Sequence, residues 1–110
     1  MMVPRAKKEK FFCKKLSLTS SVEFTADNYV EKIGKLFNYL IPEIEWANGE
    51  NGIVNIIRCE KLEREGYTLK VKEGKIEITY SDYPGIRNAV ASLSNLIESD
   101  FLVCECEIYD

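Results

Sequence analysis

The sequence predicts an α+β fold in which a mixed β-sheet carries two helices packed on one face, in the order β-α-β-β-β-α-β. Apolar residues recur at three- and four-residue steps in residues 27–41 and 84–97, which is typical of amphipathic helices. Residues 67–80 instead alternate apolar with polar side chains, which is typical of strands. The length of 110 residues, without an internal repeat or linker, predicts a single domain, 1–110.

The chain begins with extended segments and continues into the first helix. Residues 11–19 and 22–24 have the pattern of a first strand. The helix follows from Asp27 and stops at Pro42, which cannot continue it. We interpret its apolar stripe as core rather than as the lining of a ligand pocket. The stripe consists of Tyr29, Val30, Ile33, Leu36, Phe37, Leu40 and Ile41.

Turn-forming residues separate this helix from the next strand. Two Asn-Gly pairs, at 48–49 and 51–52, lie in a segment, 46–52, that we interpret as a long connection. The strand that follows is apolar on both faces, which indicates a central position in the sheet. Its apolar residues are Ile53, Val54, Ile56 and Ile57.

A hairpin and a second helix form the most regular part of the sequence. Residues 67–72 and 75–80 alternate on either side of a Glu-Gly turn. Asp82 can cap the following helix, and Pro84 lies in its first turn, where a missing N–H costs nothing. The final segment alternates again and predicts a last strand. Its apolar face would carry Leu102, Cys104, Cys106 and Ile108.

Composition limits the class of function. A hydrophobic content of 45% with 30% charged residues is ordinary for a soluble globular protein, and no apolar run approaches the ~20 residues that span a bilayer. The net charge of −3 argues against a nucleic-acid binder, so we interpret the early basic residues as a solvated tail and a lysine-guarded edge strand. No apolar signal segment follows the first residues. We therefore expect a cytoplasmic protein, or one whose signal was removed.

The four cysteines are Cys13, Cys59, Cys104 and Cys106. Neither a C-x-x-C motif nor any histidine accompanies them, so a zinc site would lack its usual spacing. Cys104 and Cys106 are strand neighbours whose Cα atoms lie near the ~7 Å limit for a disulfide. We therefore expect reduced, metal-free thiols that are buried as small hydrophobic side chains.

No set of residues is suited to catalysis. Without histidine, Ser-His-Asp and Cys-His arrangements are excluded, and no phosphate-binding glycine loop occurs. Glu105 and Glu107 lie on one face of the predicted last strand, about 6.6 Å apart by strand rise, a separation that glycosidase carboxylates also show. Such a pair needs a cleft and unequal environments, which a flat, solvated face does not offer. We predict no catalytic residue, no cofactor and no metal site.

Three motifs occur in order within residues 66–96. They are Gly66-Tyr67-x-Leu69-x-Val71, Gly74-x-Ile76-x-Ile78 and Gly85-x-x-x-Ala89-x-x-Ser92-Leu93-x-Asn95-Leu96. Together they resemble the hairpin and second helix of the N-terminal domain that precedes the catalytic barrel in family 20 glycoside hydrolases, the β-N-acetylhexosaminidases. Residues 3–8 (VPRAKK) are similar to the start of that domain, and residues 107–110 (EIYD) look like the strand that leads into the barrel.

The resemblance implies a non-catalytic accessory domain whose partner is a catalytic barrel of the same polypeptide. In the family, an Asp-Glu pair on the barrel promotes attack by the acetamido oxygen of the substrate. That pair is not in this chain, and a barrel needs roughly 200 residues or more. Two alternatives stay open. One is a freestanding protein-interaction or carbohydrate-binding domain of the same fold. The other is the accessory domain of an α-glucuronidase or a family 84 hydrolase, because Ala6, Tyr80, Ser92 and Asn95 depart from the residues usual at their positions.

An accessory domain must present a surface to its barrel, and we expect that surface near the C-terminus, from which the barrel would continue. The candidates are aromatic residues at element ends or on faces that the helices do not cover, namely Tyr83, Phe101, Tyr109 and Trp46. They would mark an interface only if several formed one exposed patch. The alternative is that each ring folds back over the edge of its own core. We expect no nucleic-acid or membrane partner, and weak self-association is left open.

Overall fold

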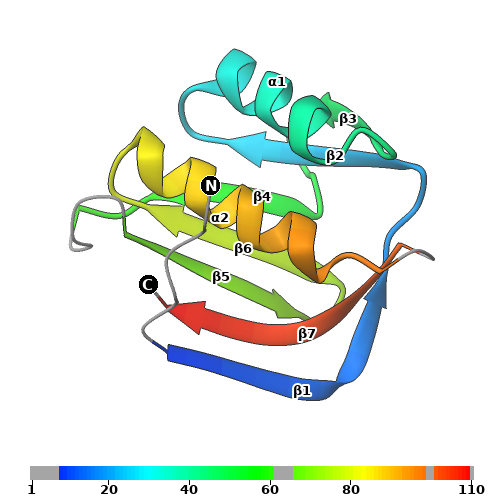
Figure 1. The fold of residues 1–110 in the computed structure, drawn as a ribbon. Coiled ribbons are helices and arrows are strands. Elements are labelled where there is room, and N and C mark those ends of the chain that lie inside the picture. Colours follow the sequence, from blue (N-terminus) through cyan, green and yellow to red (C-terminus); the bar gives the residue numbers. More distant parts are fainter. Residues whose placement is uncertain (1–7, 61–65, 99–100, 110) are drawn as a thin grey trace.

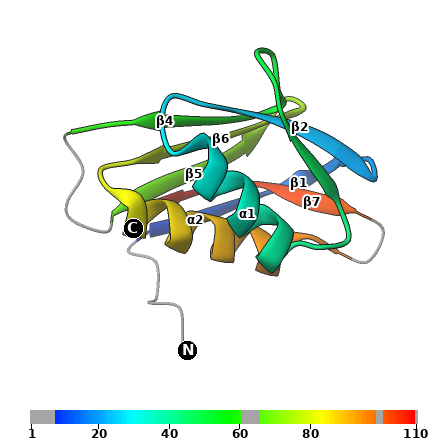
Figure 2. The same cartoon turned by 90° about the horizontal axis from the view of Figure 1, so that it is seen from above.

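The computed structural model describes residues 8–60, 66–98 and 101–109 of the chain. These residues form one seven-stranded sheet with two helices, as Figure 1 shows. Seen from above, both helices lie on the same side of the sheet (Figure 2). The other side is not covered by any element of the described chain. The predicted fold class and the predicted order of elements are therefore confirmed.

The sheet is mixed, as predicted. Its strands follow the spatial order β1-β7-β5-β6-β4-β2-β3. Pairing is antiparallel from β1 to β6 and parallel from β6 to β3. The strands are β1 (Lys8–Ser17), β2 (Ser21–Ala26), β3 (Glu45–Asn48), β4 (Val54–Arg58), β5 (Tyr67–Lys72), β6 (Lys75–Tyr80) and β7 (Leu102–Tyr109), and the helices are α1 (Val30–Leu40) and α2 (Tyr83–Leu96).

Two strands add detail to the predicted order. The first extended region is divided into β1, which pairs with β7 at one edge, and β2, which lies between β4 and β3. The short strand β3 lies in a segment that we had interpreted as connection. It forms because β2 offers a parallel edge and because Trp46 stacks on Phe37 of α1, with ring centroids 4.0 Å apart. Four residues are too few for their pattern to predict a strand.

The core lies between the sheet and the helix layer, by which we mean α1 and α2 together. Strand β4 has the expected central position, with Val54 and Ile56 fully buried beneath the helices. Its other face is open, because Ile57 is 49% exposed. Each fully buried aliphatic or aromatic side chain stabilises the fold by about 1.5–3 kcal/mol. The helices contribute Ile33, Phe37, Ile86, Ala89, Val90 and Leu93 to this core.

The two helices begin differently. Asp82 caps α2 as predicted, since its side chain accepts a hydrogen bond of 3.2 Å from the backbone N–H of Gly85. Helix α1 has no such side-chain cap, and it is preceded by Tyr29 in the left-handed region, with φ of 58°. Tyr29 is also 36% exposed, so its predicted place in the core stripe is wrong. It lies before the first helical turn and therefore outside the periodicity of the helix.

The predicted face of the last strand is only partly correct. Cys106 and Ile108 are buried as expected, but Val103 is buried in place of Leu102 and Cys104, which are half-buried. The alternation changes at the point where the pairing of β1 with β7 shifts, since the residues opposite Cys106 and Cys104 are Phe11 and Lys15. The two extra residues of β1 interrupt the ladder. Strict alternation therefore does not run through β7.

Candidate functional site

Glu105 and Glu107 lie on the open face of the sheet, as predicted. Glu107 pairs with Lys72 and accepts a hydrogen bond of 3.0 Å from the phenol of Tyr109. The hydrogen bond from Lys72 and then that from Tyr109 lower the pKa of Glu107 below its usual range. A general acid needs the opposite shift. Glu105 lines a shallow pocket of about 490 Å³ in which Glu107 takes no part, so the two carboxylates do not share a cleft.

Trp46, the first of the four aromatic candidates, is half-buried and holds β3 against α1. Its indole ring stacks on Phe37, with the two planes 12° apart. Its Nε1 donates a hydrogen bond of 3.0 Å to the carbonyl of Ile41. Both contacts lie within the domain, so this residue has a structural role.

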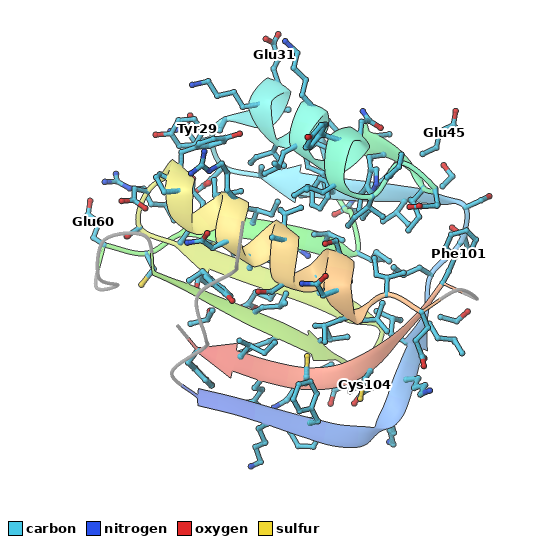
Figure 3. The ribbon with its side chains drawn as sticks, viewed as in Figure 1. Tyr29, Glu31, Glu45, Glu60, Phe101 and Cys104 are labelled. Atoms are coloured by element: carbon cyan, nitrogen blue, oxygen red, sulfur yellow. The ribbon has the colours of Figure 1, made fainter. Side chains whose placement is uncertain are left out.

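Tyr83 is half-buried at the start of α2 and belongs to a surface cluster. Its ring centroid lies 5.5 Å from that of Tyr29, which in turn lies 6.3 Å from that of Tyr80. Lys32 Nζ lies 5.4 Å from the Tyr83 ring and 5.8 Å from the Tyr29 ring. Figure 3 shows Tyr29 at the end of the molecule where both helices begin. The cluster is therefore at the N-terminal end of the helix layer.

Phe101 and Tyr109 lie elsewhere. Phe101 is at the opposite end of α2 (Figure 3), and a helix of 14 residues is about 21 Å long. Tyr109 is on the open face of the sheet, where Lys70 Nζ lies 5.6 Å from its ring. All four candidates are half-buried, and the structure does not bring them into one patch.

The outward side of the helix layer is the surface that the sequence reasoning missed. Helix α2 carries one charged residue in 14, Arg87, although several of its outward positions are only half-buried. Helices that face water usually carry charged residues along that face. Helix α1 adds Tyr39, which is 81% exposed. The scarcity of charge over residues 83–96 was a signal present in the sequence. The half-buried outward residues of α2 include Pro84, Asn88, Ala91 and Ser94.

The open face of the sheet has a different character. Lys10 and Lys70 each lie opposite Glu107 on neighbouring strands, and Lys70 also lies opposite Glu77. Opposite charges on neighbouring strands stabilise each other and can stay in contact with water. This face therefore resembles an ordinary solvated surface.

Cys59, Cys104 and Cys106 are reduced and form no disulfide. Within the described ranges there is no group of three or more ligating side chains that could hold a metal ion. The side chain of Cys13 lies outside the described residues. No helix in the described part of the chain is long and apolar enough to cross a membrane.

Comparison with known proteins gives one family match, to "Glycosyl hydrolase family 20, domain 2", over residues 3–110. No curated protein sequence matches the chain. Among solved structures, a β-N-acetylhexosaminidase from Bacteroides fragilis superposes with a TM-score of 0.84 at 22% identity, and the match covers 100% of this chain and 24% of that one.

Two further structures share the fold. An exo β-N-acetylglucosaminidase from Vibrio harveyi has a TM-score of 0.83 and 17% identity over 99% of this chain and 18% of that one. A protein named CpGH84B has a TM-score of 0.77 and 24% identity over 100% of this chain and 22% of that one. The chain therefore spans about a quarter or less of the length of these three structures. The resemblance inferred from the hairpin and helix motifs is confirmed.

Proposed function

The chain belongs to the family of glycosyl hydrolase family 20, domain 2, and from this premise we propose that it is the non-catalytic accessory domain of a β-N-acetylhexosaminidase-like glycoside hydrolase. The family match over residues 3–110 carries the proposal. The domain packs against a catalytic barrel of the same polypeptide and supports it. The share of each relative that the match covers leaves room for such a barrel.

The barrel docks on the outward side of the helix layer. This surface combines the nearly uncharged side of α2 with the exposed ring of Tyr39 on α1. The outward side of α1 is charged, with Glu31, Lys32 and Lys35 exposed, so the contact is centred on α2. Burying the outward side of α2 desolvates few charges, whereas burying the open face of the sheet would desolvate the Lys72–Glu107 ion pair. Depletion of charged residues is typical of the centre of a protein interface.

The end of β7 fits this arrangement. Strand β7 finishes at the end of the sheet where α2 begins (Figure 1). A barrel that continues from β7 therefore starts at the same end of the sheet as α2.

A charge placed on α2 tests the docking surface. Ala91→Arg puts a cation on the outward side of α2, and Ala47→Arg, at an exposed position of β3 opposite Glu23, is the matched control on the open face. In a protein that contains residues 1–110 and the barrel, Ala91→Arg should lower the thermal midpoint while Ala47→Arg leaves it unchanged. In the 110-residue chain alone, Ala91→Arg should change the free energy of unfolding by less than about 0.5 kcal/mol. Equal effects of Ala91→Arg with and without the barrel would contradict docking through this surface.

Hydrolysis assays test the non-catalytic assignment. The isolated chain should not hydrolyse aryl N-acetylglucosaminides, because the carboxylate pair Glu105 and Glu107 lacks a shared cleft and the required pKa shift. Hydrolysis by the isolated chain that Glu105→Gln or Glu107→Gln abolishes would overturn the non-catalytic assignment. The coding sequence after Asp110 is the second test, since the proposal requires a continuation of barrel length. A family 84 barrel is the second candidate, favoured by the likeness to CpGH84B.

A further inference from the structure

A groove of about 580 Å³ lies between the C-terminal ends of α1 and α2. Apolar walls come from Leu40, Ile97 and Phe101, and polar groups come from Glu43, Asn95 and Glu98. Figure 3 shows Phe101 beyond the end of α2. The size is that of a ligand pocket rather than of a packing gap.

Phe101 is held in place by its backbone. Its φ of 59° lies in the left-handed region, which a phenylalanine seldom adopts. Its N–H donates a hydrogen bond of 2.9 Å to the carbonyl of Glu98, and its carbonyl accepts one of 2.8 Å from Leu18. The backbone that carries this ring is therefore fixed at the wall of the groove.

The groove has a negative potential that the described residues neutralise only in part. Both helices direct the negative ends of their macrodipoles towards it, and neither has a basic residue in its last turn. Instead, Glu43 follows the end of α1 and Glu98 follows the end of α2, where a cation would be favourable. Lys15 pairs with Glu98 at 2.9 Å. Within the described ranges Glu43 has no ion-pair partner and is exposed.

We propose that this groove binds a basic side chain, arginine or lysine, that projects from the catalytic barrel. The assignment of the barrel as the partner rests on the proposed function. The carboxylate of Glu43 is the counter-ion, and Phe101 and Leu40 contact the aliphatic stem of the base. The combination of apolar walls with one unpaired carboxylate and two helix C-termini suits a cation with an apolar stem. It disfavours an anion, and a neutral ligand would leave Glu43 unpaired.

A titration followed by amide NMR tests the groove in the 110-residue chain. The probe is N-acetyl-arginine methylamide, and N-acetyl-citrulline methylamide is its uncharged isostere. The arginine probe should cause saturable shifts at Asn95 and its neighbours in the groove, and the citrulline probe should cause none. Glu43→Gln should weaken the binding of the arginine probe about fivefold, as expected for loss of an exposed ion pair. Glu45→Gln, on exposed β3 outside the groove, should leave binding unchanged.

Three results would overturn the groove proposal, namely no saturable shift, equal shifts with the citrulline probe, or wild-type binding by Glu43→Gln. The spectrum of each variant also shows that it is folded. The outcome is separable from docking through the helix layer, which the Ala91→Arg comparison decides. If the probe binds but Ala91→Arg has no effect in the longer protein, the groove is a binding site and its assignment to the barrel is wrong. If the probe does not bind but Ala91→Arg lowers the thermal midpoint only in the presence of the barrel, the groove proposal alone is wrong.

Discussion

The phenol of Tyr80 donates a hydrogen bond of 2.7 Å to Oδ1 of Asp27, which joins the end of β6 to the residue after β2. The other oxygen of the same carboxylate, Oδ2, accepts a hydrogen bond of 2.8 Å from the backbone N–H of Arg58 at the end of β4. Three parallel strands are therefore tied together at the end of the sheet that lies below the tyrosine cluster. Tyr80 is fully buried, whereas Asp27 is exposed and keeps contact with water.

Tyr80→Phe should lower the free energy of unfolding by about 1–2 kcal/mol, because it removes the hydrogen bond and leaves a carboxylate oxygen without its donor. Urea denaturation measures the loss. Tyr39→Phe is the control, since Tyr39 is 81% exposed and its hydroxyl faces water. Equal stability of the Tyr80→Phe variant and the wild type would show that Asp27 finds another donor.

The stability of the protein should fall as the pH rises above 10. Burial and then the hydrogen bond to Asp27 raise the pKa of Tyr80 above its ordinary value of 10.0. Tyr80 therefore loses its proton near pH 10 in the unfolded chain, whereas it keeps the proton in the folded protein. The contribution of Tyr80 to the free energy of unfolding is complete below pH 10 and declines above it. The slope from this residue is about 1.4 kcal/mol per pH unit. In urea denaturation from about pH 9 to about pH 11, Tyr80→Phe should show a shallower decline.

Two glycine substitutions should have opposite effects on the free energy of unfolding. A Cβ on Gly85 would lie 2.5 Å from the carbonyl oxygen of Gly66, so Gly85→Ala should destabilise the fold by about 3 kcal/mol. A Cβ on Gly34 would meet only Phe24, at 3.7 Å, within helix α1. Gly34→Ala should therefore stabilise the fold by about 0.5–1 kcal/mol. Thermal or urea unfolding measures both, and a Gly85→Ala variant as stable as the wild type would refute the close approach of α2 to Gly66.

The pKa of Glu107 should rise towards 4.5 in Lys72→Met, because the hydrogen bond from Lys72 is the largest cause of its depression. Tyr109→Phe should raise it by less, and Lys75→Met should leave it unchanged. Carboxylate NMR titration reads each value directly. Since the folded pKa is depressed, the stabilisation from this group is present above pH 4.5 and is lost as the pH falls through the folded value.

Thiol titration under denaturing conditions should count four thiols, because Cys59, Cys104 and Cys106 form no disulfide and we predict the same of Cys13. In the native protein Cys106 should react slowly, because it is fully buried. Cys59 and Cys104 are half-buried and should react sooner. Stoichiometric zinc in the purified protein would contradict a reduced, metal-free state.

The candidate site was less accessible to sequence reasoning than the fold. The open-face position of Glu105 and Glu107 was predictable, because residues two apart on a strand share a face. The four aromatic candidates were chosen by their places at element ends, and the structure distributes them over different surfaces. The groove was not predictable, because Glu43 and Phe101 are far apart in the sequence and meet only through the packing of α1 beside α2.

The sequence by itself determined the two helices, the hairpin and the cap at Asp82. These features depend on side-chain periodicity and on groups within a few residues of one another, so local physics suffices for them. Only the tertiary structure decided that residues 45–48 form a strand, that Val103 replaces Cys104 in the core and that Tyr29 lies outside it. Each of these depends on which strands pair and in what register, and pairing is set by contacts between segments distant in the chain.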